Sequence, residues 1–196
     1  MIKYLAAILC LTACATTSTG AKGSAASKGP SAADFYPMVI GNSWHYEARV
    51  GQTATKVNIS LVRQIDGWFE DSSGARFQVD SFGLRDEHRY LIRSPIEAGT
   101  KWSNVISVSS VEHYEIIGAN QPCEAPAGKW EGCVIVESRN RAAEGKTLVN
   151  EMTFAPGVGI VQINTTFEDH GNRVPQVSLV LTSFAPAQPP APTSSH

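Results

Sequence analysis

Apolar and polar residues alternate along much of this chain, and this period of two constrains the fold more than any other feature. The pattern runs through residues 44–50, 57–61, 148–154 and 161–167. Strict alternation is typical of a β-strand with one buried and one solvent-exposed face. The bulky residues that we expect to point inward are Trp44, Tyr46, Val57, Ile59, Leu61, Val161, Ile163 and Phe167.

Turn-forming pairs recur between the alternating segments, among them Asp66-Gly67, Ser73-Gly74, Glu144-Gly145 and Pro156-Gly157. Short strands separated by such turns predict an all-β fold. We expect about 8–10 strands in an antiparallel meander, forming a barrel, a half-barrel or a sandwich. No segment after the first 13 residues has the pattern of an amphipathic helix.

The N-terminus has the three parts of an export signal: one positive charge at Lys3, an apolar run over residues 4–11, and small residues before Cys14. The run is about half the ~20 residues that a membrane-spanning helix needs. Leu11-Thr12-Ala13-Cys14 resembles the lipobox of bacterial lipoproteins, in which the cysteine is acylated and becomes the N-terminal residue. The sequence therefore predicts a signal peptide over residues 1–13 and a lipid on Cys14. An ordinary signal peptide without a lipid is the alternative.

The rest of the chain divides by composition. Residues 14–33 hold the predicted lipidated cysteine and a tether of mostly Ala, Ser, Thr, Gly and Lys, with an expected reach on the order of 25 Å. Residues 34–185 form the predicted β-domain, and residues 186–196 form a Pro- and Ala-rich tail that we expect to be disordered. In Gram-negative lipoproteins an Asp after the acylated cysteine tends to retain the protein in the inner membrane. The resemblance to such lipoproteins, together with Ala15, therefore implies the outer membrane, with the domain facing the periplasm or the cell surface.

The charge balance argues against a nucleic-acid partner. The chain has 16 Lys and Arg against 18 Asp and Glu. Loss of Lys3 with the signal would leave 15 positive and 18 negative side chains, a balance of −3. Nucleic-acid-binding domains normally carry a basic patch and an excess of positive charge.

Two cysteines remain in the mature chain once Cys10 is removed and Cys14 is acylated. They are Cys123 and Cys133, and they flank a turn-rich segment over residues 124–132. An even pair in an exported protein predicts a disulfide. A metal site is the weaker interpretation, because no second cysteine pair or nearby histidine completes a ligand set.

Four motifs resemble those of a group of bacterial lipoproteins of unknown function. Residues 36–46 read Tyr-Pro-Met-Val-Ile-Gly-Asn-Ser-Trp-His-Tyr, which resembles the group's Tyr-Pro-x-x-x-Gly-Asn-x-Trp-x-Tyr opening. Pro95-Ile96-Glu97-Ala98-Gly99-Thr100-Lys101-Trp102 and Pro126-Ala127-Gly128-Lys129-Trp130-Glu131-Gly132-Cys133 follow, and then Ala155-Pro156-Gly157-Val158-Gly159. The resemblance implies a β-rich periplasmic domain and no active site. The chain departs from the pattern at Met38, at Trp130 and in having Cys123.

Candidate chemistry is sparse. His45 with Glu47, and His113 with Glu115, each lie on one face of a predicted strand. The two pairs could form a metal or acid–base site if the fold brought them together, although solvent-exposed strand surface is the simpler interpretation. We predict no catalytic residue, no metal and no cofactor.

Two charge clusters and four tryptophans complete the candidates. Residues 86–89 (Asp-Glu-His-Arg) and 168–170 (Glu-Asp-His) lie beside turns and are interpreted as solubilising. Trp44, Trp68, Trp102 and Trp130 could line an apolar cleft, but core positions are favoured.

These features predict a lipid-anchored, non-catalytic envelope module that binds a partner protein or has a structural role. A carrier or sensor that holds an apolar ligand inside a half-barrel, like the lipoprotein-sorting carriers, is the alternative and rests on fold analogy. An enzyme is the third hypothesis. A filled interior would favour the module and a hollow one the carrier.

Overall fold

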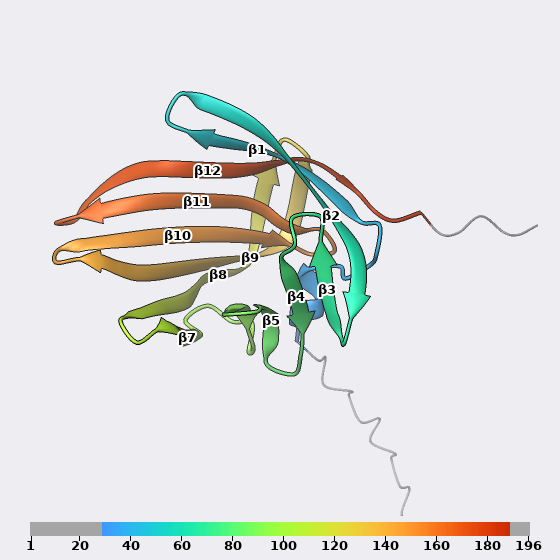
Figure 1. Cartoon of the computed structure of the whole chain (residues 1–196), viewed down its shortest axis with the longest axis horizontal. Helices are drawn as coiled ribbons and strands as arrows, with labels where there is room; N and C mark the ends of the chain where they lie inside the picture. The colour runs from blue at the N-terminus through green and yellow to red at the C-terminus, as the bar shows by residue number, and fades with distance from the viewer. Residues whose placement is uncertain (1–28, 189–196) are drawn as a thin grey trace, which may run out of the picture.

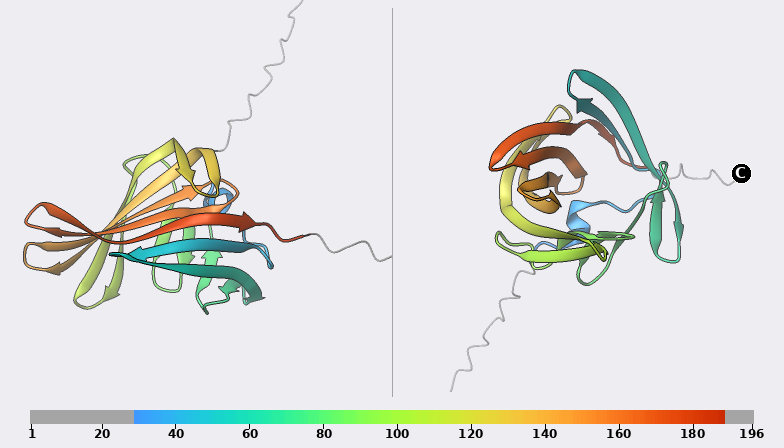
Figure 2. Two further views of the ribbon diagram at one scale, coloured as in Figure 1. Left: turned by 90° about the horizontal axis from the view of Figure 1, so that it is seen from above. Right: turned by 60° about the vertical axis from the view of Figure 1, so that its left-hand side comes forward.

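The protein folds into one antiparallel β-sheet that curls into a nearly closed barrel (Figures 1 and 2). The structure, a computed structural model, describes residues 29–188. Its elements are the 3₁₀ helix η1 (Ala32–Phe35) and the strands β1 (Ser43–Val50), β2 (Thr53–Ile65), β3 (Trp68–Asp71), β4 (Arg76–Val79), β5 (Gly83–Asp86), β6 (Tyr90–Arg93), β7 (Lys101–Ser107), β8 (Ser110–Ala125), β9 (Gly128–Ala143), β10 (Lys146–Ala155), β11 (Gly159–Asp169) and β12 (Asn172–Ala185).

The sheet order is β6-β5-β4-β3-β2-β1-β12-β11-β10-β9-β8-β7, so every sequential pair except β6 and β7 is hydrogen-bonded. The pairing of β1 with β12 joins the first strand to the last, with Ser43 opposite Ala185. The predicted all-β antiparallel meander is confirmed. Twelve strands are present rather than about 8–10, because β3 to β6 have only four residues each. Strands this short are difficult to recognise from alternation.

Side chains connect the two edge strands, β6 and β7, where the hydrogen-bonded ladder is interrupted. The Asn104 Oδ1 atom accepts a hydrogen bond from the Tyr90 backbone N–H at 3.1 Å, and its Nδ2 donates to the Tyr90 carbonyl at 3.3 Å. Trp102 Nε1 donates to the same carbonyl at 2.9 Å. Because Asn104 is only 7% exposed, its amide takes the place of a strand partner at the seam.

The core lies inside the barrel, on the inward face of the sheet. The 3₁₀ helix η1 packs against this core at one end of the barrel. Among the predicted inward residues, Trp44, Tyr46, Leu61 and Val161 are buried. The other four, Val57, Ile59, Ile163 and Phe167, are partly buried. The alternation therefore identified the inward face correctly, and the burial of that face decreases along the strands.

Packing begins slightly before the predicted start of the domain. Ala32, within the predicted tether, is 3% exposed in η1. After β12, the Ala187 backbone N–H donates to Asn42 Oδ1 at 2.8 Å. The predicted signal peptide, Cys14 and most of the predicted tether and tail lie outside the described residues. No helix within residues 29–188 has the length and hydropathy to cross a membrane.

Candidate binding surfaces

The barrel interior is filled at the end where η1 packs. The Trp44 ring stacks between Tyr36 and Phe184, with centroid distances of 5.3 and 5.4 Å. Trp44 Nε1 donates to the Val158 carbonyl at 2.6 Å, so its one polar atom is satisfied. The Tyr46 hydroxyl donates to the Ile160 carbonyl at 2.9 Å. Burial raises the pKa of Tyr36 and of Tyr46 above the ordinary tyrosine range, which keeps both hydroxyls neutral.

Farther along the same face, polar side chains replace the aromatic ones. Asn150 lies directly opposite Thr165 on β11 and Ser138 on β9. The Thr165 hydroxyl donates to Asn150 Oδ1 at 2.7 Å, and Asn150 Nδ2 donates to Ser138 Oγ at 3.4 Å. We call these three residues the polar rung. It spans three strands, and Ser138 is buried whereas Asn150 and Thr165 are only partly buried.

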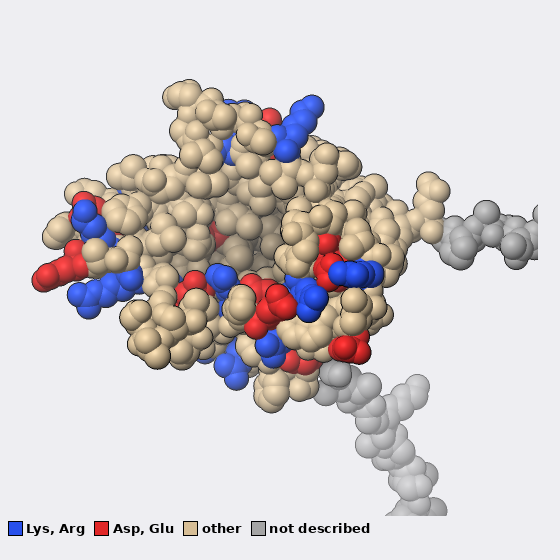
Figure 3. Space-filling model, viewed as in Figure 1, with Lys and Arg blue, Asp and Glu red and all other residues tan. Residues whose placement is uncertain are grey.

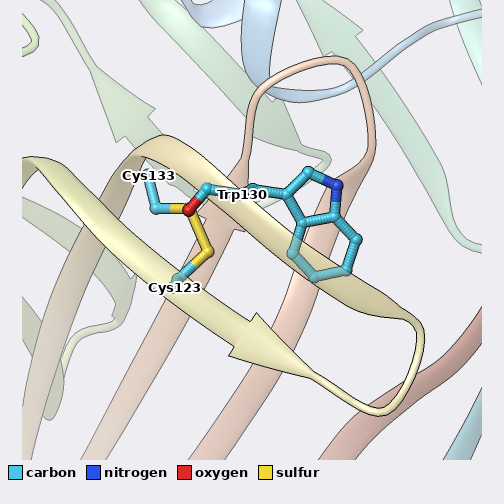
Figure 4. The surroundings of a disulfide bond; sticks show 3 residues. All are labelled: Cys123, Trp130 and Cys133. Carbon is cyan, nitrogen blue, oxygen red and sulfur yellow. A yellow bond between two sulfur atoms is a disulfide. The ribbon is translucent and has the colours of Figure 1, made fainter.

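The β8–β9 hairpin carries the disulfide (Figure 4). Cys123 and Cys133 are joined with an S–S distance of 2.02 Å, and Cys133 is fully buried. Trp130 lies on the same hairpin and is half-buried. Its ring packs closely over Gly128, and a Cβ atom at that position would lie only 3.2 Å from the ring. The disulfide therefore fixes the end of a hairpin that projects beyond β7 and β10.

The opposite face of the sheet, which we call the outer face, carries a network of four charged residues. Arg139 on β9 donates to Glu168 on β11 at 2.8 Å and to Glu137 at 3.1 Å. Arg173 on β12 is 3.2 Å from Glu168 and 3.6 Å from Glu137. Side chains from three strands thus converge above Val149 on β10, which is 3% exposed. The hydrogen bond from Arg139 is the main cause that lowers the pKa of Glu168.

Next to this network, the outer face holds a pocket of about 470 Å³ over β10, β11, β12 and the end of β1. We call it the polar pocket for its hydrogen-bonding groups, although Val149, Pro175 and Val177 also line it. Glu151, Asn164 and Ser178 lie directly opposite one another on successive strands and line it. Thr166 and Arg173 also line the pocket. Carboxylate, amide, hydroxyl and guanidinium groups can together donate and accept several hydrogen bonds. The pocket is chemically suited to a polar ligand or to a polar segment of another protein.

A second pocket, of about 520 Å³, is mostly apolar and lies where the described chain begins. Phe35, Ile96, Val134 and Pro156 contribute apolar surface, and Asn120 is among its polar lining residues. Phe35 and Val134 are almost fully buried, at 2% and 1% exposure. This pocket is suited to a small apolar group.

The two predicted histidine pairs do not come together. His45 and Glu47 lie on the outer face of β1, and His113 and Glu115 lie on the same face of β8, with β12, β11, β10 and β9 between them. His45 pairs with Asn58 and His113 with Ser103. Within residues 29–188, no cluster of three or more His, Cys, Asp or Glu side chains is arranged to hold a metal ion.

The two charge clusters contribute ion pairs that join different strands. Arg89, from the 86–89 cluster, forms an ion pair with Glu112 on β8 at 3.3 Å, across the seam between β6 and β7. The Tyr114 hydroxyl donates to Glu112 at 2.7 Å, and burial raises the Tyr114 pKa. Glu168, from the second cluster, belongs to the four-residue network described above. Interpreting these clusters as merely solubilising was therefore wrong for Arg89 and Glu168.

The four tryptophans divide into two kinds. Trp44 and Trp102 are core residues, at 1% and 6% exposure. Trp68 and Trp130 are half-buried, and the Arg85 guanidinium lies 5.1 Å from the Trp68 ring centroid. Trp68 lies on β3 and Trp130 on β9, in two different hairpins, so the four tryptophans do not line a common cleft.

The polar pocket, the polar rung and the seam residue Asn104 were not identified from the sequence. Asn150 carried a weak signal, because it is a polar residue at a position where the alternation of residues 148–154 calls for an apolar one. Asn104 carried none, because Val105 and Ile106 interrupt any alternation there. The pocket carried no such signal, since outward-facing polar residues are expected on any half-exposed strand.

Comparisons with known proteins give little beyond this description. No protein-family model matches the chain, and no curated protein matches it. A crystal structure from Parabacteroides distasonis, provisionally described as that of a lipoprotein, is similar with a TM-score of 0.41 and 13% sequence identity. The match covers 77% of this chain and 98% of the other.

Proposed function

We propose that this protein is a lipid-anchored, non-catalytic module of the bacterial cell envelope, which binds a polar partner on the outer face of its barrel. The observation that supports a module over a carrier is the filled interior around Trp44. A ring that is 1% exposed, stacked on both sides and hydrogen-bonded through its nitrogen leaves no space for a ligand at that level.

The partner surface in this proposal is the polar pocket lined by Glu151, Asn164 and Ser178. The neighbouring charged residues are engaged in the four-residue network, so they hold the strands rather than act as free acids or bases. Hydrogen-bonding groups on a rigid sheet suit recognition, because little conformational entropy is lost when a partner binds.

The anchor is tested by acylation. Expressed in a bacterium that is fed labelled fatty acid, the protein should incorporate the label and partition into detergent, whereas Cys14→Ala should do neither. Two or more acyl chains would hold the protein on a membrane durably, since each buried CH₂ group contributes about 0.8 kcal/mol. Equal labelling of the two forms would exclude a lipid on Cys14.

The choice between module and carrier is tested by the molecules that co-purify with the protein. The unlipidated Cys14→Ala form should yield no stoichiometric lipid when it is extracted and analysed by mass spectrometry.

The apolar pocket at Phe35 and Val134 is the observation that favours the second candidate, a carrier of an apolar ligand. Ala119 also lines this pocket, so Ala119→Trp should fill it. Stoichiometric lipid that disappears in this variant would establish the carrier instead.

A further inference from the structure

The tip of the β7–β8 hairpin is an exposed aliphatic knob. Its residues Val105, Ile106, Val108 and Val111 are all exposed, with Val105 at 72% and Val108 without any shielding. No charged residue lies between Lys101 and Glu112. The tip is accordingly tan in Figure 3, at the lower left, while blue and red charged side chains mark much of the surrounding surface.

This knob is unusual for a sheet edge. Soluble proteins normally protect an edge strand with charged residues, because an exposed apolar edge invites association. The base of the hairpin, in contrast, is firmly held. Trp102 and Tyr114 stack there at 5.3 Å, and Lys101 pairs with Glu115 at 3.2 Å. The aliphatic groups are therefore presented on a rigid support.

The arrangement of the side chains favours one kind of partner. Val105 and Val111 lie opposite each other and share a face of the hairpin. A register shift between Val105 and Ser107 places Ile106 at a β-bulge, and Val108 lies in the turn between the strands. A partner strand or a second copy of the chain would cover one edge or one face. Here the exposed aliphatic groups lie on a face, at a β-bulge and in the turn, and such an apolar tip suits immersion in an apolar phase.

A lipid bilayer is the apolar phase that the proposed anchor places within reach. Fourteen residues, 15–28, lie between Cys14 and Gly29, where the described chain begins. For the tether predicted from the sequence, a typical end-to-end distance over that length is about 20 Å. The described chain begins on the lower side of the barrel in Figure 1, and the β7–β8 hairpin also lies on that side. Tethering raises the effective concentration of the tip at the bilayer, so even weak insertion would be populated.

We propose that the β7–β8 tip inserts its aliphatic side chains into the surface of the membrane that holds the anchor, and so fixes the orientation of the barrel. The inference rests on the proposed lipid anchor. The outer face of β10 to β12 would then be held in one orientation relative to the bilayer. The serine hydroxyls between the aliphatic residues, at Ser107 and Ser109, can hydrogen-bond to lipid headgroups.

The test uses the lipidated full-length protein in vesicles of phosphatidylethanolamine and phosphatidylglycerol. A fluorophore is attached to Val108→Cys, and the matched control is Gln52→Cys, an exposed residue in the β1–β2 turn on the upper side of Figure 1. Cys123 and Cys133 are bonded to each other and do not react with the label. Quenching is compared for a water-soluble quencher and for a nitroxide carried on a lipid acyl chain.

At Val108 we expect the water-soluble quencher to be several-fold less effective in the presence of vesicles than in buffer without them. The nitroxide on the lipid acyl chain should quench the same label. The Gln52 label should show neither change. Flotation with the vesicles, combined with full aqueous access at Val108, would overturn the insertion and leave the anchor intact. Failure to float would overturn the anchor and the insertion together. Concentration-dependent self-quenching of the Val108 label without lipid would show that a second copy, and not the bilayer, covers the tip.

Discussion

The two halves of the barrel interior use the same strand pattern for different purposes. Near η1, the inward positions hold stacked aromatic residues around Trp44, and that half is filled. Toward the β9–β10 and β11–β12 turns, the same face carries the polar rung of Ser138, Asn150 and Thr165. We call this half of the interior the open half. Alternation alone therefore determines which face points inward. The size and polarity of the inward residues determine whether that face is packed.

The largest effect should come from removing the ring at the centre of the filled half. Trp44→Ala should lower the free energy of unfolding by about 3–5 kcal/mol, as large-to-small core changes do. Phe167→Ala, on the same face in the open half, should cost clearly less because Phe167 is only partly buried. Urea denaturation of the two variants measures the difference. Equal losses would mean that the halves are packed alike.

A somewhat smaller effect should follow from removing the disulfide of the β8–β9 hairpin. The two cysteines are 10 residues apart, and closing so short a loop stabilises the fold by about 2.5–3 kcal/mol on the chain-entropy model. The double variant Cys123→Ala/Cys133→Ala should lower the free energy of unfolding by that amount. Reductant should destabilise the parent protein and leave the double variant unchanged. A variant as stable as the parent would show that the filled half holds this hairpin without the covalent link.

Much of the filled half could be predicted from the sequence, because it depends on local pattern. The inward positions of Trp44, Tyr46, Leu61 and Val161 follow from a period of two. The pairing of Cys123 with Cys133 follows from there being two cysteines in an exported chain. Local sequence carries both kinds of information.

The seam and the outer-face network could not be predicted in this way. The contact between Arg89 and Glu112, and that between Arg173 and Glu137, depend on how the sheet curls. The curl in turn depends on register shifts such as those at His45/Tyr46 and Thr165/Thr166. A β-bulge bends a strand and increases its twist, and composition and spacing do not locate it.

The open half should respond weakly to loss of its polar rung. Thr165→Val keeps the shape of the side chain and removes the hydrogen bond to Asn150, which should cost about 0.5–1.5 kcal/mol. Thr166→Val, at the neighbouring position on the outer face, is the matched control and should cost less. Thermal or urea unfolding compares the two. A gain in stability for Thr165→Val would indicate that the open half is as dry as the filled one.

The smallest effect should be a change in acid sensitivity that arises from the outer-face network. Arg139 and Arg173 hold the pKa of Glu168 below its ordinary value of 4.5. A carboxyl group whose pKa is lower in the folded than in the unfolded state stabilises the fold fully above the unfolded pKa. That stability is lost as the pH falls from 4.5 through the lower folded value, because the folded protein then takes up the proton and the ion pairs weaken.

Glu168→Gln should therefore be slightly less stable than the parent at neutral pH, and the gap should close as the pH falls below 4.5. Arg139→Gln removes the main group that lowers the Glu168 pKa, so it should flatten the same part of the pH profile. Free energies of unfolding measured across this range test both variants. Hydrogen exchange should locate the acid-induced loosening in β9 to β12 rather than around Trp44. If Glu168→Gln kept the full acid sensitivity of the parent, the network would not contribute to stability, and the open half would be held by its backbone ladders alone.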